Sequence, residues 1–366
     1  MLMTNYILQR IAWIFVILIT TLTITFVLLK LAPEFPPTKN DERDIWLTRQ
    51  YNDGYYTLEI YSISDPEDVQ RVDEIRLEEG VNKTIFIVNP VSDSTVFKVF
   101  RRVPIFEQYM TWLNNVITEF NWGTSSKVRV NVPAFTLISS RFPITIRLNL
   151  LTLAFYIPFG FLFGILAALN KDSWIDNLMQ VIIIVFISLP ALVFVLLLQI
   201  VLGYQLEWLP PLFPIIELES AARVASGYII PVIAAGLPAI AGLTRLLRAE
   251  LSEVLTSEFL QLAKTKGLSY RQAVVRHAIR NSMVPMIPVI IGSFAGLLSG
   301  SFILERVYSI PGIGRVTLTA LAAGNYDYNV LMVSSAFYGV IGLFAVLIVD
   351  LSYGIIDPRI RMGAKK

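Results

Sequence analysis

The sequence contains no cysteine and a single histidine, His277, and both shortages exclude kinds of function. A chain without cysteine forms neither disulfides nor a thiolate metal site. One histidine leaves too little material for a zinc site or for catalysis that relies on histidine. The nucleotide-binding pattern G-x-x-x-x-G-K-[ST] is also absent. An enzyme is therefore disfavoured, and any use of ATP would have to come from another protein.

Charged residues are scarce as well, at 16% of the 366 residues, while apolar residues make up 55%. Ordinary soluble domains carry about 25% charge. The net charge of +2 and the lack of a basic run disfavour nucleic acid as a partner. The composition therefore predicts a protein that crosses a membrane several times.

The apolar run from Ile11 to Leu31 is long enough to cross about 30 Å of hydrocarbon. It exceeds the ~7–15 residues of a signal-peptide core and no cleavage site follows it, so we expect a retained first span. Five further runs meet the same length criterion, at 148–169, 178–203, 228–247, 284–304 and 330–351. The sequence thus predicts an all-α membrane protein with six transmembrane helices.

Lysine and arginine in the short loops and tails predict the orientation of these spans. One side would carry Arg10, Lys171, seven residues from Arg245 to Arg280, and Arg359, Arg361, Lys365 and Lys366. The short loops on the other side carry only Arg223, Arg306 and Arg315. Because the basic side faces the cytoplasm, both termini are expected inside and the region between the first two spans outside.

This outer region is expected to contain a small α+β unit over residues 34–100. Residues 65–80 have helical spacing, and 84–88 and 95–100 have the composition of strands. A charged linker around short strands is the alternative.

Residues 105–120 repeat apolar side chains at helical spacing, which predicts an amphipathic helix. That helix could lie at the outer membrane interface or pack against the insert. Its apolar residues are Phe106, Tyr109, Met110, Leu113, Ile117 and Phe120.

Asp, Glu, Lys, Arg and His are absent from 148–169, 178–203, 284–304 and 330–349. Proton-coupled and ion-coupled transporters usually need such groups inside the membrane, so a stand-alone secondary transporter or channel is disfavoured. Gly292, Gly296 and Gly300 instead form two small-xxx-small steps, which allow helices to approach closely. Helix packing is one interpretation of these glycines, and a pathway lined by small residues is the other.

The polar stretch between the later spans, residues 245–285, predicts two short helices. The first would start at an N-cap at Thr256 or Ser257 and stop at Gly267. It would gather Phe259, Leu262, Ala263 and Lys266 on one mostly apolar face. Ser269 and Gln272 form a capping box for the second helix, which would run to about Asn281. Such a loop could lie on anionic lipid or be held by a protein.

This loop resembles the cytoplasmic EAA loop of permease subunits in binding-protein-dependent ABC importers. The pattern of that loop is an acidic residue and two alanines, followed four residues later by glycine. Ala263 and Gly267 match the second alanine and the glycine. The string LAKTKGLSYRQAVVRHAIRNSMVP is similar to the peptide branch of that family. Ser188-Leu189-Pro190, the element 305–315 and the segment 353–361 also resemble family patterns. The resemblance covers about 1–33 and 105–366 and fits the first of the paired oligopeptide/dipeptide permeases best. Residues 34–104 have no counterpart in these patterns, and Ala32–Pro36 departs from them.

The resemblance implies one half of a translocation pathway for oligopeptides or dipeptides in a bacterial plasma membrane, with a second permease forming the other half. Two cytosolic subunits would bind ATP and magnesium, neither of which this chain would hold, and a solute-binding lipoprotein would deliver the peptide. Permeases for nickel, glutathione and other small solutes are similar, so these substrates remain alternatives. The residues expected to contact an ATPase are Glu258, Phe259, Ala263, Lys266 and Gly267, with Arg276 and Arg280 in support.

The span pattern and the resemblance together suggest further roles and the domain boundaries. Residues expected along the pathway or in helix packing are Ser188, Pro190, Gly292, Gly296 and Gly300. An outer gate element would contain Glu305, Pro311, Gly312 and Gly314. The expected parts are an N-terminal span (1–32), an insert (33–104), an interfacial segment (105–145), a permease core (146–357) with its loop (245–283), and a tail (358–366).

Overall fold

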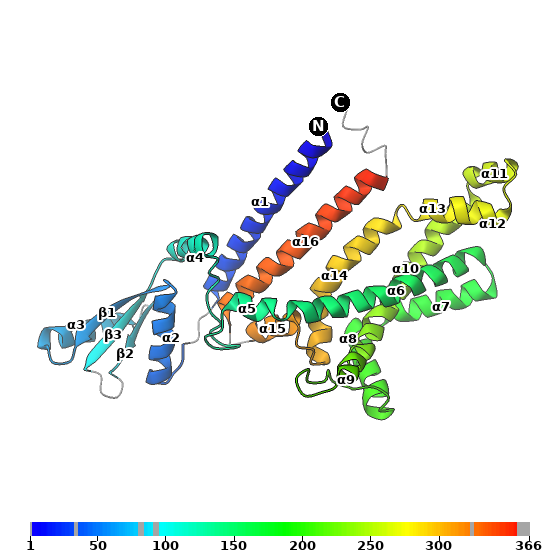
Figure 1. Cartoon of the computed structure of the whole chain (residues 1–366). Helices are drawn as coiled ribbons and strands as arrows, with labels where there is room; N and C mark the ends of the chain where they lie inside the picture. Colours follow the sequence, from blue (N-terminus) through cyan, green and yellow to red (C-terminus); the bar gives the residue numbers. More distant parts are fainter. Residues whose placement is uncertain (1, 33–35, 80–83, 91–94, 323–325, 357–366) are drawn as a thin grey trace. The chain divides into compact units, whose positions relative to one another are not determined.

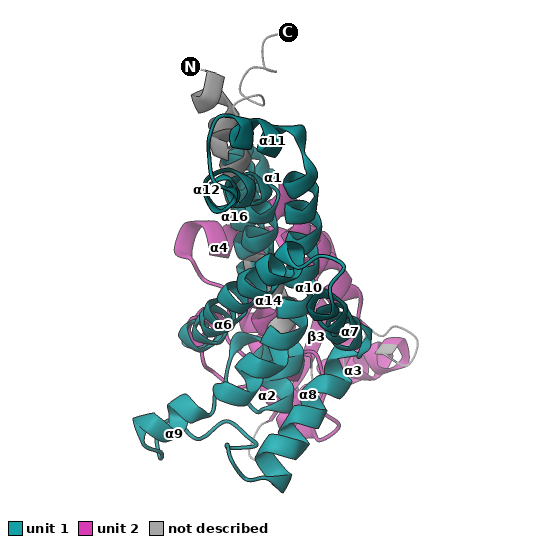
Figure 2. Ribbon diagram, turned by 90° about the vertical axis from the view of Figure 1, so that its right-hand side faces the viewer, with its two compact units in different colours: residues 1–16, 140–318, 337–366 teal, residues 17–139, 319–336 magenta. Residues whose placement is uncertain are grey.

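The computed structural model describes residues 2–32, 36–79, 84–90, 95–322 and 326–356, without the side chains of 2–8, 79, 294–301 and 352–356. It divides into two compact units, coloured separately in Figure 2. Unit 1 comprises 1–16, 140–318 and 337–366, and unit 2 comprises 17–139 and 319–336. The described residues are mostly helical, and they include one small sheet, in unit 2.

The sheet of unit 2 confirms the α+β prediction for the insert (Figure 1). Its strands β1 (Tyr56–Ser62), β2 (Ile85–Val88) and β3 (Val96–Arg102) are antiparallel, with β3 in the centre. Neighbouring side chains of β3 point to opposite faces. Val99 packs with α3 (Pro66–Glu79), and Phe100 packs with α2 (Asn40–Asn52). Both faces of the sheet are therefore covered, although the sequence patterns missed α2 and β1.

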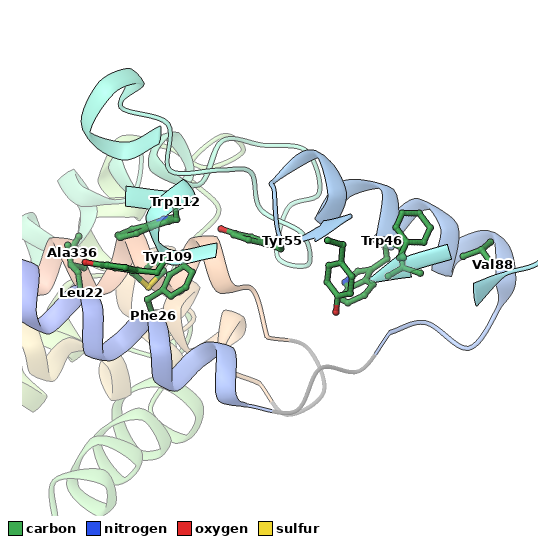
Figure 3. Packing of buried hydrophobic residues seen from close by; sticks show 12 residues of the cluster. Leu22, Phe26, Trp46, Tyr55, Val88, Tyr109, Trp112 and Ala336 are labelled. Atoms are coloured by element: carbon green, nitrogen blue, oxygen red, sulfur yellow. The ribbon is translucent and has the colours of Figure 1, made fainter. Parts of the chain in front are cut away.

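An aromatic cluster joins the insert to two helices of the same unit. Phe26 of α1 (Leu2–Leu31) lies 5.5 Å from both Tyr109 and Trp112 of α4 (Ile105–Glu119), measured between ring centroids. Tyr55 completes the group at 6.5 Å from Phe26 (Figure 3). Helix α4 thus packs against buried aromatic side chains. The predicted helix is confirmed. Of its apolar residues, Tyr109 is buried in this cluster, whereas Phe106, Met110, Ile117 and Phe120 are exposed within the chain.

Lys30, at the end of α1, lies inside this aromatic environment and is only 2% exposed. Its ammonium group is 3.5 Å from the centroid of the Tyr55 ring and 4.9 Å from that of Tyr328. Aromatic faces attract cations, which offsets part of the cost of burying the charge. Nearby, burial raises the pKa of the Asp53 carboxyl, although Lys30 and Arg49 act in the opposite direction.

Asp327 fastens the loop after α4 to the start of α16 (Tyr328–Ile356). Its carboxylate accepts hydrogen bonds from the Ser125 hydroxyl at 2.6 Å and from the backbone N–H groups of Lys127 and Val128 at 2.9 and 3.0 Å. Asp327 is fully buried. Three donors on one carboxylate satisfy a charge that would otherwise be costly to bury.

Unit 1 is built around two long helices, α6 (Phe142–Leu169) and α10 (Ile229–Thr256), which pack along each other. A Cβ atom added to Gly164 would lie 2.9 Å from Cβ of Leu247, and one at Gly160 equally close to Cβ of Leu243. These two glycines are four residues apart, so they form a small-xxx-small step that lets the helices approach. The sequence analysis did not identify this pair.

Four helical segments among the described residues are long and apolar enough to cross a membrane: 9–31, 134–169, 221–256 and 328–351. The predicted span 178–203 is not one helix. It is broken into α7 (Trp174–Ser188) and α8 (Ala191–Leu198), and the chain bends by 100° between them. Helix α8 continues into the π-helix η1 (Gln199–Gln205). Pro190 lacks an N–H and disfavours a helical Leu189, which explains the break. Counted as one span, the bent pair gives a fifth candidate.

The predicted span 284–304 corresponds to α14 (Met286–Val307), which is helical throughout. Short helices complete the unit. They are α9 (Ala221–Ser226), α11 (Glu258–Thr265), α12 (Tyr270–Ala273), η2 (Val274–Ala278), α13 (Ile279–Ser282) and α15 (Ile313–Ala320). Figure 1 shows α11 and α12 at one end of α10 and α9 at the other end.

Candidate functional site

Helix α11 is the first helix of the polar loop that resembles the EAA loop, and one of its sides packs against α10. Leu260 is 1% exposed and Ala263 is 7% exposed, and both pack in a cluster with Leu247 and Leu251 of α10. The predicted N-cap position is confirmed at Ser257, but the expected side-chain cap is not formed. The Ser257 hydroxyl donates instead to the carbonyl of Val254 at 2.6 Å. The burial of two side chains therefore holds the start of α11.

The outer side of α11 is apolar and exposed. Phe259 is 49% exposed and Leu262 is 53% exposed. The sequence analysis placed these two residues on one face with Ala263, whereas the structure buries Ala263 and turns Phe259 and Leu262 outward. The helix therefore has an apolar anchor on one side and an apolar exposed patch on the other. Glu258, Lys266, Arg276 and Arg280 are also exposed.

The turn after α11 depends on Gly267, which has a φ of +91°. Side chains rarely adopt such a backbone conformation, so glycine is favoured here for its freedom rather than for space. Its N–H donates to the carbonyl of Lys264 at 3.0 Å, and no atom lies within 4 Å of where a Cβ would stand. The helix stop predicted from the sequence is confirmed.

The second helix of the loop starts with the predicted capping box, in which Ser269 and Gln272 each bond the other's backbone N–H. Helical structure then continues through η2 to Ser282. One π-helical turn, Val274–Ala278, contains His277. The His277 ring lies 5.8 Å from the Phe259 ring at 77°, so the two helices of the loop meet through an edge-to-face contact.

An ion pair with a buried carboxylate and a half-buried guanidinium lies between α7 and α10, and the sequence analysis missed it. Arg248 donates two hydrogen bonds of 2.6 Å to the two carboxylate oxygens of Asp176. Asp176 is 1% exposed. Its carboxylate also accepts the N–H of Asp172 at 2.9 Å. This bidentate contact fixes α7 to the helix that leads into the loop.

The predicted gate element is assembled around Glu305, which is fully buried. Its carboxylate accepts the Thr145 hydroxyl at 2.7 Å and the N–H of Arg315 at 3.0 Å. The Thr145 hydroxyl in turn accepts the N–H of Ile313 at 2.9 Å. The structure therefore joins the end of α14, the start of α15 and the start of α6 through one buried carboxylate.

Gly312 and Gly314 make room for this carboxylate. A Cβ on Gly312 would overlap the Glu305 carboxylate, and one on Gly314 would lie 2.9 Å from Cα of Phe302. Pro311 directly precedes them, in the stretch between α14 and α15. Sequence reasoning grouped Glu305, Gly312 and Gly314 from their pattern, and the structure brings all three together.

Tyr308 extends this network toward α8 and the following loop. Its hydroxyl donates to the carbonyl of Val195 at 2.7 Å, and its own carbonyl accepts the N–H of Phe213 at the same distance. Gln199 donates to the carbonyl of Pro211 at 2.8 Å. The sequence pattern did not single out these side chains, whose partners lie far away in the chain.

The remaining predicted residues lie apart from these clusters. Ser188 and Pro190 flank the break between α7 and α8 and are exposed within this chain. A Cβ on Gly292 would meet nothing within 4 Å, so this glycine is not a close packing point within the chain. Gly296 and Gly300 belong to α14, but their surroundings lie outside the described side chains.

Comparison with known proteins assigns the chain to a family. Residues 160–362 match the family described as "Binding-protein-dependent transport system inner membrane component". The dipeptide transport system permease protein DppB of Lactococcus lactis subsp. cremoris (strain MG1363) is 35% identical over 259 residues. That alignment covers 71% of this chain and 82% of the relative. The glutathione transport system permease protein GsiC of Escherichia coli O1:K1 / APEC is 29% identical over 280 residues, or 75% and 87% of the two chains.

The insert, too, is matched among the relatives. A putative peptide transport system permease protein of Brucella abortus (strain 2308) is 27% identical over 359 residues, which cover 98% of this chain and 99% of the relative. Because the alignment spans nearly the whole chain, it includes residues 34–104, for which the sequence patterns offered no counterpart. The chain belongs to the family of inner membrane components of binding-protein-dependent transport systems and is a permease subunit.

Proposed function

We propose that this permease subunit forms half of the translocation pathway of a bacterial importer of oligopeptides or dipeptides. The observation that carries the proposal is the 35% identity with a dipeptide permease over 71% of the chain. A second, similar permease would form the other half, two cytosolic subunits would bind ATP and magnesium, and a solute-binding lipoprotein would deliver the peptide. The peptide-permease relative that spans the whole chain supports the same substrate class.

The proposed membrane arrangement has six spans, with both termini in the cytoplasm. The four single segments and the bent pair α7–α8 supply five spans. Helix α14 would supply the sixth, because its 22 residues extend roughly 33 Å. The lysines and arginines of the 256–283 loop favour its placement in the cytoplasm. The insert, α9 and the loop before α9 would then lie outside.

In this arrangement the 256–283 loop would be the contact with the ATP-binding subunits. Its exposed Phe259 and Leu262 present apolar area to a partner, while Leu260 and Ala263 fix α11 to α10. Because α11 is packed against α10, a movement of the bound ATP-binding subunit would be transmitted through α11 to the membrane-spanning helices. Glu258, Lys266, Arg276 and Arg280 surround the patch with exposed charge and would set the orientation of the partner.

Leu262→Glu is expected to reduce co-purification of the ATP-binding subunits at least ten-fold and to abolish uptake. Burying an unpaired carboxylate in an apolar interface costs several kcal/mol, whereas the free subunit tolerates the change because Leu262 is exposed. The measurement is the yield of ATP-binding subunits on the tagged permease, together with uptake of labelled peptide in cells.

Gln261→Glu is the matched control, since it adds the same charge at the neighbouring exposed position of α11. It is expected to leave assembly nearly unchanged. If Leu262→Glu inserts normally and retains its ATP-binding subunits and uptake, α11 is not the docking helix.

The glutathione permease among the relatives favours a second candidate, a permease for a small non-standard peptide or another small solute such as nickel. Uptake of labelled dipeptide, oligopeptide, glutathione and nickel by cells that express the complete transporter separates the candidates. Uptake of dipeptide or oligopeptide supports the first proposal. Uptake restricted to glutathione or nickel replaces it.

A further inference from the structure

An open cavity of about 760 Å³ lies in unit 1, between the first turns of α6, the segment around α9 and the start of α10. This volume is in the range of about 300–1,000 Å³ that is usual for sites of small ligands. Its walls are mostly aliphatic and aromatic. They include Leu151, Phe155, Ile229, Val232 and Ile233.

Two charged side chains of opposite sign line this cavity. Arg147 comes from the second turn of α6, and Glu219 comes from the residue before Ser220, the N-cap of α9. Both are exposed, and among the described residues no ion pair within 4 Å involves either of them. The buried Tyr228 adds a third polar group, and its ring lies 4.9 Å from that of Phe213. The cavity therefore offers an apolar wall with one cationic and one anionic group.

The position of Arg147 favours a ligand rather than lipid at this face. Arg147 directly precedes the apolar run 148–169, so the proposed membrane arrangement would place its guanidinium at the edge of the hydrocarbon region. Charged groups on membrane helices usually face protein or water-filled cavities, because contact with lipid is costly. At such an edge the local dielectric is low, and a guanidinium binds a carboxylate more strongly than in water.

We propose that this cavity receives the ends of the transported peptide, with Arg147 binding the carboxylate of the C-terminus and Glu219 attracting the free ammonium group. The apolar walls would accept side chains of varied shape. The inference rests on the proposed function, and it adds a substrate class: peptides with a free C-terminal carboxylate. In the proposed orientation the cavity opens on the side where the peptide arrives.

The test uses the complete transporter in liposomes with saturating binding protein, which is loaded with either a tripeptide or its C-terminal amide. Arg147→Gln is expected to lower transport of the free-acid tripeptide about ten-fold or more, because a charge-assisted hydrogen bond is lost. Transport of the amide is expected to change less than two-fold. Arg147→Lys, which keeps the charge, is expected to restore part of the free-acid transport.

Arg223→Gln is the matched control, since Arg223 is exposed on α9 but does not line the cavity. Subunit composition and ATPase activity without binding protein are expected to stay unchanged in all variants. An equal loss for both peptides, or no loss for either, would overturn the proposal. Loss of the second permease from Arg147→Gln would also overturn it and would show a subunit interface instead. If the unaltered transporter carries neither peptide, the proposed function itself fails.

Discussion

Arg248→Ala is expected to destabilise the permease by about 1–3 kcal/mol, because it removes two charge-assisted hydrogen bonds from the buried carboxylate of Asp176, which keeps the N–H of Asp172. The ion pair joins α7 to α10 through two hydrogen bonds of 2.6 Å. Its loss should loosen the helix that carries α11, so coupling to ATP hydrolysis should decline together with stability. The measurements are the thermal unfolding midpoint in detergent and the ATPase activity stimulated by binding protein.

Asp172→Asn is the matched control for this prediction. Asp172 is exposed and lies in the same turn. Its backbone N–H, which asparagine keeps, contacts Asp176, and its carboxylate acts on Arg248 through charge, so this control removes a nearby charge but leaves both hydrogen bonds of the pair. Its φ of +64° is also compatible with asparagine. An unfolding midpoint of Arg248→Ala equal to that of the control would show that the pair contributes nothing to stability.

Gly312→Ala is expected to cost about 2–4 kcal/mol and to abolish uptake, since the added methyl group overlaps the Glu305 carboxylate. The carboxylate accepts hydrogen bonds from the Thr145 hydroxyl and the N–H of Arg315, and Glu305 is fully buried. Displacing it leaves buried polar groups unpaired. The measurements are the unfolding midpoint of the purified subunit and uptake of labelled peptide.

Gly342→Ala provides the comparison, because a Cβ at this glycine of α16 meets nothing within 4 Å. Alanine favours a helix over glycine, so this control should be neutral or slightly stabilising. Normal uptake by Gly312→Ala would show that the Glu305 cluster tolerates movement and is not a rigid part of the pathway.

Features encoded by local patterns could be predicted from the sequence. The helix stop at Gly267 and the capping box at Ser269 depend on residues within one or two turns, and both are confirmed. The family pattern also grouped Glu305 with Gly312. The Glu305 carboxylate occupies the space that a side chain at position 312 would need. In each case the partner lies within ten residues in the chain.

Features that depend on distant partners were not predictable in the same way. Asp176 and Arg248 are 72 residues apart, and Thr145 and Glu305 are 160 apart. No local pattern indicates which of many charged or hydroxyl side chains will meet. The outward rotation of Phe259 and Leu262 was missed for a related reason, because helical spacing alone does not show which of two apolar faces the rest of the protein will cover.

The 100° break between α7 and α8 places the ends of two helices beside each other in the middle of an otherwise apolar segment. Helix ends leave backbone carbonyl and N–H groups without partners inside the helix. At the break the Leu189 N–H still donates to the carbonyl of Val185, and the Pro190 carbonyl accepts the N–H of Phe194, but Ser188, Leu189 and Pro190 are exposed within this chain. Lipid hydrocarbon offers no hydrogen bonds to such groups. Each backbone group without a hydrogen-bond partner there costs several kcal/mol. We therefore expect the break to meet water or another subunit, so that lipid does not surround this segment on all sides.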